Sequence, residues 1–162
     1  MASTFETLLL AQGSFLSNPP IAVLVQSSAT TTVPTNTWTS IGFDSSTIDN
    51  YGGHSNVTSN SRYTIQVPGK YLVSGTVAFA LNTSGDRGAK IVKNGSTIQG
   101  PYSLVGSAST AHGVSISTAG FIVACSASDY LELQGYQNTG GNLATQIGVD
   151  QDSFLSVLWV SS

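Results

Sequence analysis

From residue 21 onward, apolar and polar residues alternate in short runs along the chain. Within residues 62–67, Tyr63 and Ile65 alternate with polar side chains, and residues 71–79 continue the same pattern. A period of two residues is typical of β-strands, and no segment after residue 20 has a helical period. The pattern therefore predicts one all-β domain over residues 21–162.

Turn residues separate these runs. Asn94 and Gly95 lie between two of them, and this pair favours a type I′ hairpin turn because both central residues need a positive φ. Residues 114–125 form another strand region, in which Ala119 and Gly120 predict a bulge. Eight to ten short strands joined by turns indicate an antiparallel sandwich or jelly roll.

The first and last predicted strands are apolar on both faces. They are Ile21–Val25 and residues 154–160. Because an antiparallel strand usually has one face in water, we expect the outer face of both strands to be covered. Another copy of the chain is the expected cover, since closed symmetric self-association is common. A loop or the N-terminal segment is the alternative.

The N-terminal segment, residues 1–20, has a different pattern. It carries six large apolar residues, and the spacing of the first three suits one face of a short helix. An exposed segment this apolar is unfavourable in water, so we expect an arm that docks on another protein; a frayed tail is the alternative. The predicted anchoring residues are Phe5, Leu8, Leu9, Leu10, Phe15 and Leu16.

The composition narrows the class of protein further. Charged residues make up 8% of the chain, against about 25% in average soluble proteins. Five basic residues and a net charge of −3 argue against nucleic-acid binding, which needs many phosphate contacts. No apolar run approaches the length of a membrane helix. One cysteine excludes an intramolecular disulfide framework and a thiolate zinc cage.

Few residues are candidates for chemistry. Cys125 lies in an apolar run, which favours a buried, inert thiol. Neither His54 nor His112 has a partner at metal-ligand spacing. Asp150 and Asp152 flank one residue, and alternating acids can bind calcium, but the EF-hand pattern is absent and the sequence leaves calcium binding open. We expect no catalytic site, no cofactor and no enzymatic activity.

Three tyrosines at predicted loops or strand ends, Tyr51, Tyr102 and Tyr136, have rings suited to stacking on sugars. Tyrosines at such positions more often lie at the rim of an interface or in the core. They leave a host-surface glycan as an alternative binding partner.

Five blocks of sequence carry a family resemblance. They are residues 36–44, 59–75, 91–96, 129–138 and 154–158. In this order they resemble the globular domain of the complement C1q/tumour necrosis factor superfamily, most closely its bacteriophage and bacterial structural versions. The resemblance covers residues 21–162, and its most specific element runs from Tyr63 to Gly75. The last strand departs from the pattern, because Ser156 stands where glycine is usual.

This resemblance implies an antiparallel ten-stranded jelly roll that forms tight homotrimers. The terminal strands then lie near the threefold axis, which agrees with their two apolar faces. The predicted interface residues are Leu155, Val157, Trp159, Val23 and Val25. Phe154 and Leu158 are then expected in the core, although the alternation also permits the opposite assignment of the two faces.

Together these expectations describe a non-enzymatic virion protein. We expect a trimeric decoration protein on the capsid exterior of a tailed bacteriophage, with the arm bound to the major capsid protein. The N-terminus lacks the basic region of a secretory signal, so we expect synthesis in the host cytoplasm. The alternative is a receptor- or glycan-binding head of a tail fibre or bacterial surface filament.

Overall fold

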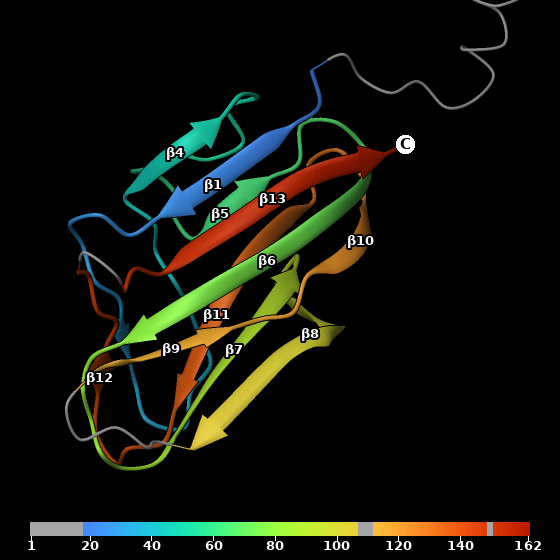
Figure 1. Cartoon of the computed structure of the whole chain (residues 1–162). Coiled ribbons are helices and arrows are strands. Elements are labelled where there is room, and N and C mark those ends of the chain that lie inside the picture. The colour runs from blue at the N-terminus through green and yellow to red at the C-terminus, as the bar shows by residue number, and fades with distance from the viewer. Residues whose placement is uncertain (1–17, 107–111, 149–150) are drawn as a thin grey trace, which may run out of the picture.

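The computed structural model describes residues 18–106, 112–148 and 151–162, which form thirteen strands and no helix (Figure 1). The predicted N-terminal helix and the six arm residues lie outside the described residues. In chain order the strands are β1 (Ile21–Val25), β2 (Thr32–Val33), β3 (Thr39–Ser40), β4 (Ser45–Asp49), β5 (Arg62–Thr64), β6 (Gly69–Phe79), β7 (Asp86–Lys93), β8 (Ser96–Gly106), β9 (Val114–Ser117), β10 (Phe121–Cys125), β11 (Tyr130–Gln137), β12 (Leu143–Ala144) and β13 (Phe154–Ser161).

Two antiparallel sheets pack face to face. The first has the order β10-β6-β13-β1-β4, with β9 also paired to β6. The second has the order β3-β11-β7-β8, with β5 also paired to β11, and β2 and β12 form a separate short pair. Figure 1 shows the first sheet in front of the second. The predicted all-β, antiparallel jelly roll is confirmed. The structure has thirteen strands where ten were expected, and three of the thirteen have only two residues.

The first and last strands lie side by side in the middle of the first sheet. β13 pairs with both β6 and β1, and β1 continues the sheet to β4. On β1, Ala22 and Leu24 are fully buried between the sheets, while the alternate positions point outward. The core therefore accounts for one apolar face of the terminal strands, and no other described element covers the second face.

A corner at the start of β6 joins the two sheets. The indole Nε1 of Trp159 donates a hydrogen bond of 3.3 Å to the carbonyl of Pro68, and the Tyr71 hydroxyl donates to the Val67 carbonyl. Gly69 has a φ of 152°, and a Cβ on it would lie 2.5 Å from the carbonyl oxygen of Ser161. Glycine is needed here because any larger residue would collide with β13.

Two sequence predictions about turns can be compared with the structure. Asn94 and Gly95 have φ values of 52° and 73°, as the type I′ hairpin between β7 and β8 requires. Residues 114–125 form two strands, β9 and β10, both paired to β6. β9 pairs with the second half of β6 and β10 with the first half, and between them three residues, 118–120, stand opposite two residues of β6. The Thr118 amide donates to the Gly75 carbonyl at 2.8 Å, so the extra residue forms the predicted bulge.

The carboxylate of Asp44 fixes the loop after β1. It accepts hydrogen bonds from the backbone amides of Ser27, Ser28 and Ala29 and from the hydroxyls of both serines. Slight burial acts to raise the pKa of Asp44, but the bonds from Ser28 and Ser27 outweigh it and hold the pKa well below its usual range.

We expect Asp44→Asn to lower the free energy of unfolding at pH 7 by about 1–2 kcal/mol, because bonds to a charged acceptor are lost at a largely solvated site. Since the folded-state pKa is depressed, this contribution is present above the unfolded pKa of about 4. It is lost as pH falls below that value. Urea denaturation at pH 7 and pH 3 should therefore show a smaller difference between variant and parent at pH 3. Asp152→Asn is the control, and equal differences at both pH values would contradict the prediction.

Candidate functional site

The outer face of the first sheet carries rows of apolar side chains. Residues paired directly across antiparallel strands point to the same face, so the register defines each row. One row crosses four strands and contains Ile21, Leu158, Leu72 and Ile122. The next contains Ile48, Val23, Ser156 and Ser74, and the third contains Val25, Phe154 and Thr76. None of the three rows contains a charged side chain.

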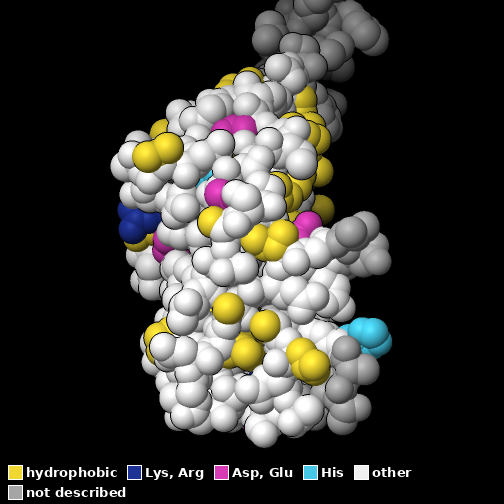
Figure 2. Space-filling view, turned by 90° about the vertical axis from the view of Figure 1, so that its left-hand side faces the viewer, with side chains coloured by type: hydrophobic (Ala, Val, Ile, Leu, Met, Phe, Trp, Pro, Cys, Tyr) yellow, Lys and Arg dark blue, Asp and Glu magenta, His cyan; other side chains and the backbone are white. Residues whose placement is uncertain are grey.

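Several of these side chains are well exposed on a single chain. The exposed fraction is 55% for Ile122, 48% for Ile48, 38% for Leu72 and 36% for Leu158. Figure 2 shows a surface made mostly of polar uncharged atoms, with hydrophobic side chains along its upper right-hand margin, next to the face that Figure 1 turns to the viewer. A contiguous exposed apolar face of this kind marks an interaction surface. We call these three rows the apolar sheet face.

The structure corrects three of the predicted interface residues. Leu155, Val157 and Trp159 are buried between the two sheets, so they belong to the core of the single chain. Phe154 and Leu158, expected in the core, point outward. The alternation along β13 was predicted correctly, but its direction was not, because both sides of this strand are apolar.

The other predicted interface residues, Val23 and Val25, lie on the apolar sheet face and are half-buried. Sequence reasoning missed Ile48, Leu72 and Ile122. Leu72 and Ile122 are next to each other in the register of β6 and β10. Their signal was an apolar residue at an outward position of the alternation: Leu72 lies between two buried residues, and Ile122 lies between half-buried Phe121 and buried Val123.

The remaining sequence candidates that the structure describes form no group of metal ligands. Cys125 is buried, and burial raises its thiol pKa to about 11, so the thiol is protonated at neutral pH. Asp152 accepts a hydrogen bond of 2.8 Å from the Gly148 amide; Asp150 lies outside the described residues. Within the described part of the chain, no three His, Cys, Asp or Glu residues are grouped as metal ligands. The described residues also include no helix long and apolar enough to cross a membrane.

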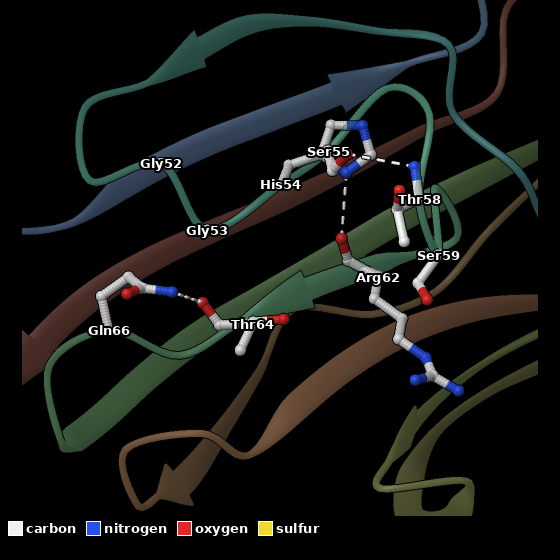
Figure 3. Close-up of a pocket in the computed structure, with 9 residues that line it drawn as sticks. All are labelled: Gly52, Gly53, His54, Ser55, Thr58, Ser59, Arg62, Thr64 and Gln66. Atoms are coloured by element: carbon white, nitrogen blue, oxygen red, sulfur yellow. Dashed lines mark hydrogen bonds between the residues drawn. The ribbon is translucent and has the colours of Figure 1, made fainter.

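A polar pocket of about 260 Å³ lies between the loop after β4 and strand β5 (Figure 3). His54 Nδ1 lies 2.9 Å from the Arg62 carbonyl oxygen, whereas its Nε2 is buried without a hydrogen-bond partner. The guanidinium of Arg62 extends away from His54, donates to Glu132 at 3.3 Å and lies 4.0 Å from the Tyr130 ring centroid. The pocket lining has hydroxyls but no carboxylate or thiol, so it offers His54 no partner for acid–base chemistry.

Solved structures with the same architecture come from two related groups. The globular domain of zebrafish complement 1qA matches with a TM-score of 0.56 and 12% identity, over 88% of this chain and 98% of the other. Murine APRIL matches with a TM-score of 0.61 and 12% identity, over 88% and 100%. Eiger TNF from S. frugiperda matches with a TM-score of 0.57 and 14% identity, over 90% and 95%.

The chain has the C1q/TNF-like jelly-roll fold. At identities this low, the similarity concerns the fold and does not carry a ligand or an activity across. No protein-family model matches the sequence. No curated protein matches it either.

Proposed function

We propose that this C1q/TNF-like jelly roll is a non-enzymatic virion structural protein. In this proposal it forms a trimeric decoration protein on the capsid exterior of a tailed bacteriophage, and residues 1–20 bind the major capsid protein. The observation that carries the proposal is the apolar sheet face, in which exposed Leu158, Leu72 and Ile122 adjoin without a charge among them.

Self-association explains this face better than a loop does. In the described residues, β4, β1, β13, β6 and β10 all lie in one sheet, and the second sheet covers only their inner side. Joining the outer faces of several copies around one axis removes this apolar area from water without any further chain. A trimer also matches the symmetry of threefold and quasi-threefold positions on a capsid.

The rest of the surface suits a structural role at the exterior of a particle. The chain has 25 serines and 18 threonines but only 13 charged residues. Interactions between exposed charges weaken as salt rises, so a surface of hydroxyls and amides changes little between dilute and concentrated salt. The six apolar residues of the N-terminal segment supply a separate contact for the shell.

Two measurements test the proposal. Light scattering of the full chain should give about three times 16.7 kDa, and the mass of a single chain would overturn self-association. In sedimentation with capsids that lack this protein, the full chain should bind and a variant without residues 2–20 should not, although it should keep its trimer mass. Undiminished binding of the truncated trimer would overturn attachment through the arm.

A further inference from the structure

A second surface feature lies on the opposite side of the domain, on the outer face of the second sheet. Trp38, just before β3, lies between Tyr136 of β11 and Tyr102 of β8. The ring centroids of Trp38 and Tyr136 are 5.2 Å apart, and those of Trp38 and Tyr102 are 5.8 Å apart. Tyr102 is 53% exposed, and the other two rings are half-buried. We call these three residues the aromatic row.

The backbone beneath the row holds the indole in place. A Cβ on Gly88 of β7 would lie 3.0 Å from Cη2 of Trp38 and 3.2 Å from Cδ1 of Leu104. The absence of a side chain at Gly88 therefore lets the indole lie directly against the sheet. At one end of the row, the Tyr136 hydroxyl donates to Asn36 Oδ1 at 3.1 Å. The rings are thus fixed before any ligand arrives, which lowers the entropic cost of binding.

A positive charge adjoins the row. Lys90 Nζ lies 4.4 Å from the Trp38 ring centroid and donates to Thr97 Oγ1 at 3.2 Å. The ion pairs of the described residues join Arg62 to Glu132 and Lys93 to Asp129, so neither uses Lys90. Packing against the ring removes water from this ammonium and lowers its pKa. Lys90 thus presents a cation that no carboxylate of the described chain neutralises.

We propose that the aromatic row binds an acidic oligosaccharide, with sugar rings stacked on Trp38 and Tyr102 and a sugar carboxylate at Lys90. The apolar faces of pyranose rings pack on flat aromatic rings, while polar groups at the margin bind their hydroxyls. The side chains of Gln134 and Ser40, joined by a hydrogen bond of 3.3 Å, supply such groups beside Lys90. The charge complementarity between Lys90 and a carboxylate selects acidic sugars over neutral ones.

The surface favours an acidic sugar over nucleic acid as the ligand, and it keeps the aromatic row separate from the apolar sheet face. Nucleic acid would also stack on aromatic rings, but its binding depends on several phosphate contacts, and Lys90 is the cation that contacts this row. The row lies on the second sheet, whereas the apolar sheet face lies on the first. Self-association through the first sheet therefore leaves the row open, and the two proposals can fail separately.

Tryptophan fluorescence provides a direct test on the full chain. The protein has two tryptophans, and Trp159 is buried, so a ligand at the row changes the emission of Trp38. The probes are hexasaccharides of galacturonic, mannuronic and sialic acid, each paired with its carboxyl-reduced neutral form. We expect saturable binding of at least one acidic hexasaccharide and at least about fivefold weaker binding of its neutral form.

Matched variants assign the binding to the row. Trp38→Ala and Tyr102→Ala should each weaken binding about tenfold or more by calorimetry, and Lys90→Gln about fivefold at low salt. Tyr130→Ala and Lys70→Gln, which change an aromatic ring and a charge elsewhere on the surface, should leave it unchanged. No binding of any acidic hexasaccharide, equal binding of the neutral forms, or full binding by Trp38→Ala would each overturn the proposal. Circular dichroism verifies that every variant is folded.

Discussion

Replacing Leu158 with lysine should prevent the proposed self-association and give folded single chains. Leu158 lies in the row formed with Ile21, Leu72 and Ile122, the most apolar row of the apolar sheet face. In an assembly built on this face, each copy would bury an ammonium without a partner. Burying an unpaired neutral polar group costs about 2–7 kcal/mol, and burying an unpaired charge costs more. Light scattering should show the mass fall to about 16.7 kDa.

The fold itself should survive this change. Leu158 is already 36% exposed on a single chain, and a surface substitution of that kind usually changes stability by about 0.5 kcal/mol or less. Far-ultraviolet circular dichroism should therefore show the same β signal before and after. Leu81→Lys is the matched control, because Leu81 is 47% exposed and lies outside the apolar sheet face, between β6 and β7. An unchanged mass for Leu158→Lys would place the self-association contact elsewhere.

The strands that the sequence predicted best are those with a clear alternation or a specific turn. Ile21–Val25 has the same bounds in the structure as in the prediction, and Asn94 and Gly95 form the predicted turn. Strand β4, Ser45–Asp49, was missed because its serines and threonine carry little apolar signal. Its pairing with β1 nevertheless brings Ile48 to the apolar sheet face.

The functional surfaces were harder to predict than the strands, because each depends on register between distant segments. In residues 154–160 both sides are apolar, so only the contacts of neighbouring strands determine which side is buried. Lys90 and Trp38 are far apart in the sequence, and they meet because β11 pairs with both β3 and β7. Tyr51, one of the three tyrosines for which sugar stacking was left as an alternative, donates its hydroxyl to the Asn18 carbonyl at 2.9 Å and is not part of the aromatic row. Trp38 was not among the candidate sugar-stacking residues, because the sequence does not show that its ring lies beside Tyr102 and Tyr136.

Replacing Trp159 with alanine should destabilise the fold of the single chain, whereas the change at its neighbour Leu158 should leave the fold intact. The Trp159 side chain is 5% exposed, packs in the core and donates to the Pro68 carbonyl at 3.3 Å. Removing it leaves a large cavity and an unsatisfied carbonyl beside Gly69, which lowers the free energy of unfolding by about 3–5 kcal/mol. Urea denaturation should show an earlier midpoint with a similar slope.

The measurement is cleanest in the Leu158→Lys background, because the stability of an assembly depends on protein concentration and that of a single chain does not. Trp159→Phe serves as the graded control: it keeps a ring in the core, loses the hydrogen bond and should cost less than Trp159→Ala. If Trp159→Ala instead left the unfolding midpoint of the Leu158→Lys single chain unchanged, and abolished self-association when introduced alone into the parent chain, β13 would present its other side to the partner. The two adjacent substitutions thus decide which face of the last strand holds the domain together and which face joins one copy to the next.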